Sequence, residues 1–257
     1  MKRLNRIFKP DGRTVVIAMD HGMGMNVNPA LDQTEEKLRA IVAGGADAVL
    51  VSYGIAKRYA HVLGDIGVIV RADGGYSAIP SDANGHPRLL FSVEDALRIG
   101  ADAVVCNGFP GTPNEQDCMK NVAELVRQGS AWGVPVMAEM LPGGFGNLVE
   151  KSPANVRLAA RTGCEYGASI IKTTFTGTPE EFKTVVDASY QPVVILGGEA
   201  VKDLSSLFVC IEQALSVGAA GVAIGRNVWN HPDPKAVTQA LVDLVHNGKK
   251  AADIHGL

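Results

Sequence analysis

Short runs of apolar, mostly β-branched residues recur along this chain, and each is followed by a segment with helical periodicity. Eight such runs lie at residues 14–19, 47–52, 68–71, 102–106, 134–140, 167–174, 192–196 and 220–224. Runs of this length that are apolar on both faces are typical of parallel strands, because helices cover both faces of a parallel sheet. The alternation therefore predicts a series of βα units.

Eight βα units can close into a barrel or form an open, doubly wound sheet. A closed barrel needs about 250 residues, which matches the 257 residues of this chain and leaves no unit over. No linker-like stretch rich in Pro, Gly or Ser divides the sequence. We therefore expect the α/β class and one domain, residues 1–257, folded as a single (β/α)8 TIM barrel.

Local sequence marks several helix starts. Ser152-Pro153 and Thr178-Pro179 each place a capping side chain before a proline, and Glu181 supplies the acid of a capping box. Asp32 and Glu35 have the same three-residue spacing. We expect a helix to begin at each of these three places.

Composition excludes several function classes. The formal net charge is -3 and no long basic run is present, which argues against a nucleic-acid partner. No stretch is long and apolar enough to span a membrane, and no apolar segment follows the basic N-terminus, so a soluble, cytoplasmic protein is expected. The cysteines are too far apart for a metal-binding motif and are expected to be reduced thiols: Cys106, Cys118, Cys164 and Cys210.

The polar residues that follow the predicted strands indicate where chemistry takes place. In a (β/α)8 barrel the reacting groups lie at the carboxyl ends of the strands, which meet at one mouth. These ends carry acids, an amine, an imidazole and glycine-rich turns, and they read in order Asp20-His21, Tyr53, Asp73, Asn107, Glu139, Lys172, Gly197-Gly198 and Gly225-Arg226.

Lys172 ends an apolar strand and has two interpretations. It is either an end-of-strand charge that reaches solvent or an amine in a desolvated pocket, where it can act as a nucleophile. A neutral lysine amine attacks a ketone or aldehyde, and the resulting iminium withdraws electrons from a neighbouring C–C bond. The proton transfers need a carboxylate, for which Asp20 and Glu139 are the candidates. A cap or an ion pair is the structural alternative for both acids.

The turns after strands seven and eight predict a phosphate site. Gly197-Gly198 and Gly225 allow close approach of backbone N–H groups to an anion, and Arg226 adds a charge-assisted contact. His21 is a further candidate for substrate binding. No second histidine lies at metal-ligand spacing from it, so no metal is expected.

Five segments together carry a resemblance to a known family: residues 3–8, 15–22, 170–173, 193–198 and 221–226. They resemble the archaeal-type class I fructose-bisphosphate aldolase family, which also contains the autoinducer-2 phospho-dione thiolase and the aminodideoxyheptulosonate synthase. The match spans nearly the whole chain and preserves motif order. The resemblance implies a (β/α)8 homo-oligomer, commonly a decamer of two pentameric rings. It also implies Lys172 as Schiff-base lysine, Asp20 as acid/base residue, and a phosphate held by Gly197, Gly198, Gly225 and Arg226.

The fifth strand departs from the family pattern. The aldolase and the heptulosonate synthase carry a catalytic tyrosine just before Pro-Arg-Gly, whereas this chain has Leu141 and then Pro142-Gly143-Gly144. The thiolase branch also lacks that tyrosine. Leucine cannot transfer a proton, so we hypothesise that Glu139 does so instead.

The function expected first is a class I aldolase that reversibly cleaves a C–C bond in a phosphorylated keto-sugar, with no cofactor. The first alternative is a thiolase-like transfer of an acetyl group from a phosphorylated pentane-dione to coenzyme A, a co-substrate. The second is a phosphosugar-binding barrel without catalysis. The segments expected to close over the substrate are Tyr76–Leu90 and Phe109–Glu115.

Overall fold

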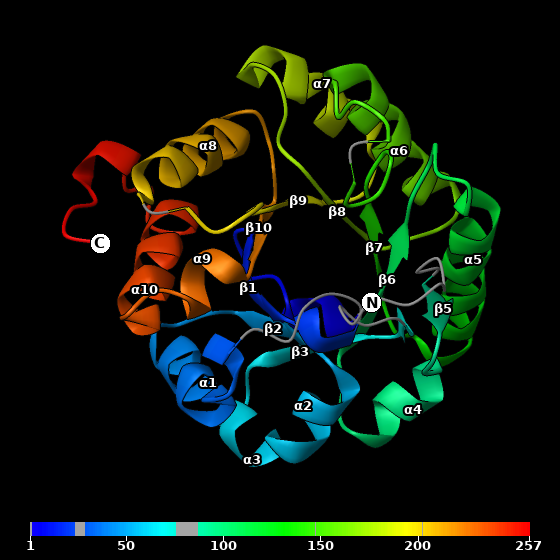
Figure 1. Ribbon diagram of the computed structural model, residues 1–257, viewed down its shortest axis with the longest axis horizontal. Coiled ribbons are helices and arrows are strands. Elements are labelled where there is room, and N and C mark those ends of the chain that lie inside the picture. Colours follow the sequence, from blue (N-terminus) through cyan, green and yellow to red (C-terminus); the bar gives the residue numbers. More distant parts are fainter. Residues whose placement is uncertain (1, 24–28, 76–86, 147, 202) are drawn as a thin grey trace.

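Eight parallel strands close into a barrel in the computed structural model, which describes residues 2–23, 29–75, 87–146, 148–201 and 203–257 (Figure 1). Around the ring the order is β1-β2-β3-β6-β7-β8-β9-β10, and β10 pairs with β1. The (β/α)8 barrel is therefore confirmed, and the alternative of an open, doubly wound sheet is wrong. The strands are β1 Thr14–Met19, β2 Ala48–Val51, β3 Gly67–Arg71, β6 Ala103–Gly108, β7 Val136–Met140, β8 Ile170–Thr173, β9 Val193–Leu196 and β10 Gly221–Ile224.

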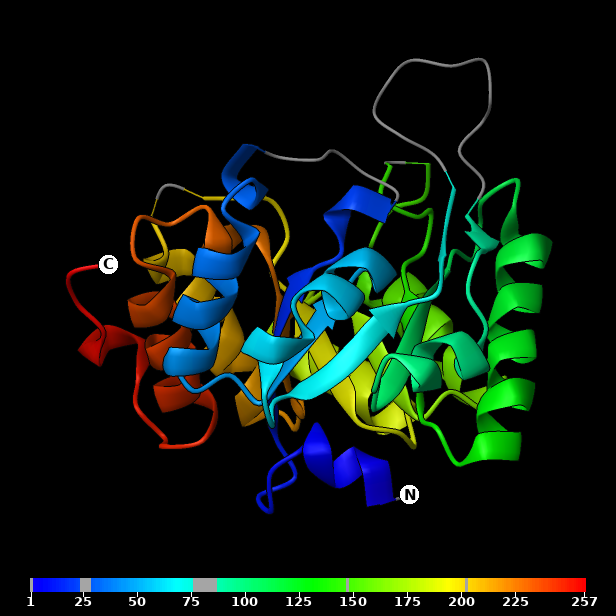
Figure 2. The same ribbon diagram turned by 90° about the horizontal axis from the view of Figure 1, so that it is seen from below.

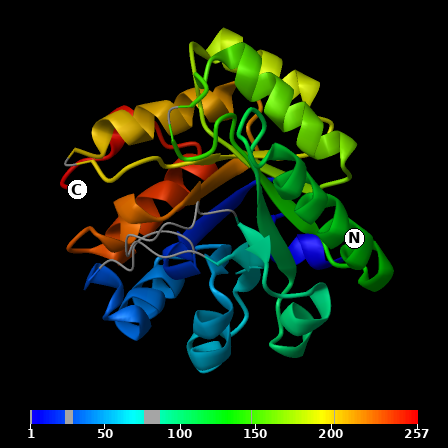
Figure 3. The same ribbon diagram turned by 45° about the vertical axis from the view of Figure 1, so that its right-hand side comes forward.

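The helices surround the strand ring, as the oblique view shows most clearly (Figure 3). They are α1 Thr34–Ala43, α2 Tyr53–Arg58, α3 Ala60–Leu63, α4 Val93–Arg98, α5 Glu115–Trp132, α6 Pro153–Glu165, α7 Pro179–Ala188, α8 Ser205–Ser216, α9 Arg226–Trp229 and α10 Pro234–Val245. Short 3-10 turns are η1 Lys2–Arg6, η2 His21–Met23, η3 Pro29–Leu31 and η4 Ala251–Asp253. Within the described ranges, no helix combines the length and the apolar character that crossing a bilayer requires.

A helix begins at each of the three predicted places, and two of the three have the predicted cap. The Ser152 hydroxyl accepts a hydrogen bond from the N–H of Asn155, and Thr178 forms a capping box with Glu181. The third helix, α1, begins at Thr34 within the predicted segment, but the predicted cap is wrong, because the N-cap position is Gln33 and no side chain caps it. The N–H of Asp32 donates instead to the carbonyl of Pro29 at 3.0 Å, so Asp32 lies in the turn before the helix.

Short elements depart most from the sequence-based expectation. Strands β4 (Asp73–Gly74) and β5 (Arg88–Leu89) form an antiparallel ribbon that was not expected, and two short helices, α2 and α3, follow β2 in place of a single longer helix. Elements of two to six residues are too short to display a hydrophobic period. The four cysteines are free thiols.

The barrel interior holds one of the apolar cores. Alternate strand residues point inward, among them Ala18, Ile69, Val105, Met137 and Ile170, while their neighbours pack against the helices. Ile7 joins this core from just after η1, which covers the amino ends of the strands (Figure 2). Two positions after these inward residues, the same alternation directs polar side chains toward the barrel axis at the carboxyl ends: Asp20, Arg71, Asn107, Glu139 and Lys172.

His246 links two acids at the amino end of the barrel. Its Nδ1 lies 2.7 Å from Asp11 Oδ2, and its Nε2 lies 2.8 Å from Asp47 Oδ2. The hydrogen bond to Asp47 raises the pKa of His246, although burial opposes this. A raised folded-state pKa stabilises the fold fully below the unfolded value of about 6.5, and the contribution is lost as pH rises through the folded value.

The His246→Ala variant is therefore expected to lose about 1 kcal/mol of unfolding free energy at pH 6 and less at pH 9. Urea unfolding of wild type and variant at the two pH values measures this difference. His61→Ala is the matched control, because that imidazole is exposed and lies 3.7 Å from Glu35. An equal loss at both pH values would show that the ion pairs contribute nothing and that only packing was removed.

Candidate active site

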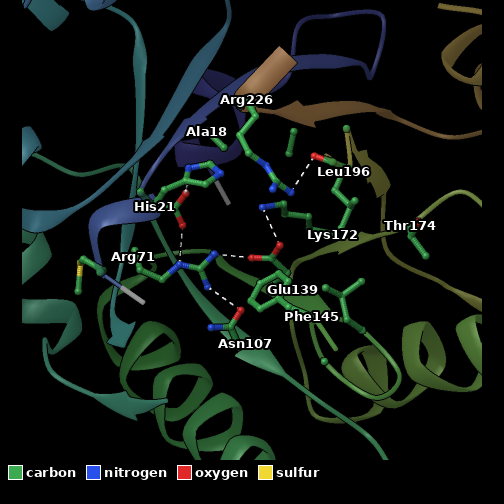
Figure 4. A pocket seen from close by; sticks show the side chains of 18 of the residues that line it. Ala18, His21, Arg71, Asn107, Glu139, Phe145, Lys172, Thr174, Leu196 and Arg226 are labelled. Atoms are coloured by element: carbon green, nitrogen blue, oxygen red, sulfur yellow. Dashed lines mark hydrogen bonds and ion pairs between the residues drawn. The ribbon is translucent and has the colours of Figure 1, made fainter. Parts of the chain in front are cut away.

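A cavity of about 340 Å³ opens at the carboxyl ends of the barrel strands (Figure 4). Of the strand ends named from the sequence, Tyr53 is the exception, because it does not line this cavity and stacks on Phe91 with 4.3 Å between ring centroids. Residues 76–86 of one expected covering segment lie outside the described residues, and the other segment, 109–115, does not line the cavity. All the catalytic and phosphate-binding candidates named from the sequence line the cavity: Asp20, His21, Glu139, Lys172, Gly197, Gly198, Gly225 and Arg226.

Lys172 and Glu139 form a buried pair inside the cavity. They are register partners on β8 and β7, so their side chains point inward side by side. Lys172 Nζ lies 2.8 Å from Glu139 Oε1, and the two residues are only 5% and 2% exposed. The first interpretation of Lys172, an end-of-strand charge in solvent, is wrong. The amine is held where a proton can pass directly to a carboxylate.

Arg71, at the end of β3, occupies the centre of the site and was not among the candidate site residues. Its Nε donates to Asp20 Oδ2 at 2.7 Å, and its Nη2 donates to Glu139 Oε2. Its Nη1 reaches Asp73 Oδ1 at 3.2 Å and Asn107 Oδ1 at 3.1 Å. A single guanidinium therefore contacts three carboxylates and an amide (Figure 4).

Asp73 is held from a second side as well. The backbone N–H and the side-chain amide of Asn107 both donate to Asp73 Oδ2, each at 2.8 Å. Burial raises the pKa of Asp73 above its usual range, although Arg71 acts in the opposite direction.

Among the described residues, no group of three His, Cys, Asp or Glu is arranged to hold a metal ion.

The other two acids are carboxylates at neutral pH. Burial favours the protonated form of Asp20, but the charges of Arg71 and Lys172 outweigh it and lower its pKa to about 2. For Glu139, burial is again opposed, by Lys172 first and then Arg71, and the pKa is lower than usual. Neither acid is therefore a standing proton donor, although both can accept protons or hydrogen bonds.

His21 lies beside Asp20 on η2. Its Nδ1 is 3.8 Å from Asp20 Oδ1 and has no hydrogen-bond partner among the described residues. The ring meets the Trp229 indole edge-on, with 5.2 Å between centroids, and that indole donates to the carbonyl of Ala18 at 2.9 Å. Burial lowers the pKa of His21, so it is a neutral imidazole at pH 7.

The turns after β9 and β10 meet next to His21 in the wall of the cavity. A Cβ at Gly225 would lie 2.4 Å from the carbonyl oxygen of Ala18 and 2.8 Å from His21 Cε1, so the position requires glycine. Gly198 has φ +65°, in the left-handed region that glycine adopts most easily. Arg226 donates to the carbonyl of Gly198 at 2.9 Å and joins the two turns.

Comparisons with known proteins agree with this geometry. The family model described as DeoC/LacD family aldolase matches residues 14–231. The chain belongs to the DeoC/LacD aldolase family. This confirms the resemblance drawn from the sequence motifs.

Three relatives illustrate the range of activities in the DeoC/LacD family. The chain is 39% identical to a 2-amino-3,7-dideoxy-D-threo-hept-6-ulosonate synthase of Halobacterium salinarum, over 95% of this chain and 91% of the relative. It is 32% identical to a class 1 fructose-bisphosphate aldolase of Thermoproteus tenax, over 96% and 95%. It is 31% identical to a 3-hydroxy-5-phosphonooxypentane-2,4-dione thiolase of Yersinia pseudotuberculosis, over 99% and 85%.

A solved structure of the family includes a reaction intermediate. It is an archaeal fructose-1,6-bisphosphate aldolase whose catalytic lysine is covalently bound to the carbinolamine intermediate of its substrate. Its TM-score with this chain is 0.85 at 30% identity, over 95% of this chain and 98% of that chain. That structural neighbour is therefore a barrel enzyme that acts through a lysine.

Proposed function

We propose that this protein is a class I aldolase that reversibly cleaves a C–C bond in a phosphorylated keto-sugar through a Schiff base on Lys172. The observation that carries the proposal is the buried pair at the barrel mouth, in which Lys172 Nζ lies 2.8 Å from Glu139 Oε1. Membership of the aldolase family supports it. The proposal requires no cofactor, because the iminium itself accepts the electron pair.

The first steps need a proton carrier beside the amine. Glu139 accepts a proton from Lys172, and the neutral amine adds to the substrate carbonyl. Glu139 then returns a proton to the hydroxyl of the carbinolamine, which leaves as water and gives the iminium. Because Lys172 is the main charge that lowers the pKa of Glu139, this pKa rises while the amine is neutral, and the acid can hold the proton.

Cleavage needs a base for the substrate hydroxyl. The iminium attracts the electrons of the neighbouring C–C bond, and the hydroxyl one carbon further loses its proton as the aldehyde leaves. Asp20, with a pKa of about 2, is a weak base. Its fixed negative charge is suited to orient substrate hydroxyls and to stabilise the iminium. Glu139 is a carboxylate again after the dehydration and lies next to the lysine nitrogen, so it is the proposed proton acceptor for this step too.

We further propose that the substrate phosphate binds at Gly197, Gly198, Gly225 and Arg226, with His21 next to it. Backbone N–H groups at such turns and a guanidinium are well matched to a dianion. The contact between Arg226 and the carbonyl of Gly198 supports this role, since it holds the guanidinium at the junction of the two turns.

Arg226→Met is expected to raise KM for the phosphorylated ketone about tenfold or more, because a charge-assisted contact is lost. The same variant should leave turnover of the unphosphorylated analogue unchanged. Arg161→Met is the control, since Arg161 forms an ion pair with Glu165 on the exposed face of α6. Steady-state kinetics on both substrates test this, and an equal loss on both would contradict phosphate binding at Arg226.

A second candidate is favoured by Leu141, which is 2% exposed, lines the cavity and packs with Phe109 and Cys118. Because this leucine cannot transfer a proton, acetyl transfer of the thiolase kind stays open. Lys172 would hold a phosphorylated dione, and coenzyme A would take the acetyl group. The third candidate, a phosphosugar-binding barrel without catalysis, needs no imine.

Borohydride reduction followed by intact-mass measurement separates the three candidates. The protein is incubated with dihydroxyacetone phosphate, fructose phosphates and a phosphorylated pentane-dione, with and without coenzyme A. We expect an adduct on the peptide that contains Lys172, and bond cleavage without coenzyme A. Cleavage only with coenzyme A would establish the thiolase. No adduct with any phosphorylated ketone would leave the binding barrel.

Three expectations accompany the proposal: a single domain over residues 1–257, a cytoplasmic location, and a homo-oligomer that reaches a decamer. The single domain follows from the unbroken series of βα units around one barrel, and the homo-oligomer follows from the family resemblance. Light scattering on the purified protein tests the oligomer, and a monomer would contradict it.

A further inference from the structure

We infer that Arg71 is the positioning residue that holds Asp20 and Glu139 in their working orientations around the Schiff-base lysine. The inference rests on the proposed function. It concerns a residue that does not react itself, because its donors are directed at protein acceptors rather than at the open cavity. Arg71 is only 5% exposed.

The guanidinium connects acids that come from distant strands. Asp20 follows β1 and Glu139 lies on β7, and the barrel order places β2, β3 and β6 between those strands. Arg71 bridges them, with Nε on Asp20 and Nη2 on Glu139. Because the guanidinium is planar and its N–H directions are fixed, the two carboxylates are set at a defined angle to one another.

The guanidinium is itself held on its third side. Its Nη1 lies 3.2 Å from Asp73 and 3.1 Å from Asn107, and Asn107 donates twice to Asp73. Asn107 is also the register partner of Glu139 on the neighbouring strand. The contacts therefore form a closed ring, and a rotation of Arg71 would break several hydrogen bonds at once.

The charge of Arg71 also bears on the acids. The charged groups that face Asp20 are Arg71 and Lys172, beside the neutral imidazole of His21. Those that face Glu139 are Lys172, Arg71 and Asp20, with Asp73 beyond the guanidinium. Arg226 lies further out, toward His21. Without Arg71, the buried carboxylates would share Lys172 as their counterion, and their repulsion would favour protonation.

The test is the double variant Arg71→Met/Asp73→Asn, which removes one cation and one acid and so preserves the charge balance of the site. The asparagine can still accept both hydrogen bonds from Asn107. We expect kcat to fall about 100-fold while KM for the phosphorylated ketone changes less than about threefold. We also expect the acidic limb of the kcat/KM profile to move up by about one pH unit or more.

Arg71→Lys separates geometry from charge. It keeps the cation but not the planar fork, so we expect kcat to fall at least about tenfold while the acidic limb stays near its wild-type position. Arg6→Met is the control, because Arg6 pairs with Asp102 at 2.9 Å at the amino end of the barrel. It should alter neither kcat nor the pH profile.

The outcomes are distinguishable. If the double variant folds and keeps the wild-type kcat and acidic limb, the inference is wrong. If the double variant does not fold, Arg71→Lys decides, and a wild-type kcat in that variant overturns the inference. Borohydride trapping of the wild type is the separate test of the proposed function. Absence of that adduct in the wild type refutes the aldolase proposal. If the wild type forms the adduct but the Arg71 variants keep the wild-type kcat and pH profile, only the role of Arg71 is refuted.

Discussion

Replacing Lys172 with alanine is expected to lower kcat by about 10⁴-fold or more and to abolish the borohydride adduct. The amine is the atom that bonds to the substrate carbonyl in the proposed mechanism, so no neighbouring group can substitute for it. The Glu139 carboxylate keeps its hydrogen bond to Arg71 in this variant, so Glu139 retains one of its two ion pairs. Steady-state kinetics and intact mass after borohydride reduction measure the two effects.

Lys151→Ala is the matched control for this prediction. Lys151 also lines the cavity, but its Nζ donates to the carbonyl of Gly146 at 3.0 Å on the exposed side. The variant should still form the adduct. Lys172→Arg adds a second comparison, because it keeps a cation beside Glu139 without a nucleophilic amine. If Lys172→Ala kept its turnover, or if Lys151→Ala lost the adduct instead, the assignment of the Schiff-base lysine would be wrong.

The barrel could be predicted because its signal is long and repeated. Each buried strand is apolar on both faces, and eight βα units in 257 residues fill a closed barrel with none left over, which favours it over an open, doubly wound sheet. The helices after Ser152 and Thr178 could also be predicted, because their caps are hydrogen bonds between residues three positions apart in the sequence. Asp32 is not the cap, because its N–H closes the preceding 3-10 turn on the carbonyl of Pro29 and the N-cap position of α1 is Gln33.

The candidate site could be predicted in part, because strand ends indicate which residues reach the mouth but not which of them meet. Tyr53 and Asp73 both follow a strand, yet Tyr53 packs on Phe91 while Asp73 joins the cluster. Counting in twos from the inward-facing Ile69 would have identified Arg71, as the same count from Met137 identifies Glu139. The contacts of Arg71 with three carboxylates could not be predicted, because they depend on how the closed barrel brings β1, β3 and β7 to one mouth.

The proposed mechanism accommodates the strand-five exchange to Leu141. Glu139 lies two residues earlier on the same strand side, points into the lumen and already contacts Lys172. Leu141 joins a small apolar cluster with Phe109 and Cys118 at the cavity wall. In the proposed mechanism the proton therefore passes between Lys172, the substrate and Glu139, which is hydrogen-bonded to Arg71. No proton is transferred by the side chain at position 141.

Glu139→Gln is expected to lower kcat by about 10²- to 10³-fold while the adduct on Lys172 still forms. The amide has the same shape and can still accept from Arg71, but it cannot carry a proton. The Lys172 amine is itself unchanged, so the iminium still forms, with water in place of Glu139 as the proton carrier and therefore more slowly. Dehydration of the carbinolamine and cleavage of the C–C bond are the steps that should slow.

Single-turnover kinetics with borohydride quenching at successive times separates imine formation from cleavage in the Glu139→Gln variant. Glu165→Gln, on the exposed face of α6, is the control and should behave as wild type. Turnover that persists at the wild-type rate would exclude Glu139 as the proton carrier. His21 would then be the group to test, because its Nδ1 is buried, lacks a partner among the described residues and lies 3.8 Å from Asp20. If the Glu139→Gln variant instead forms the adduct but does not cleave the substrate, Glu139 is the proton carrier for cleavage.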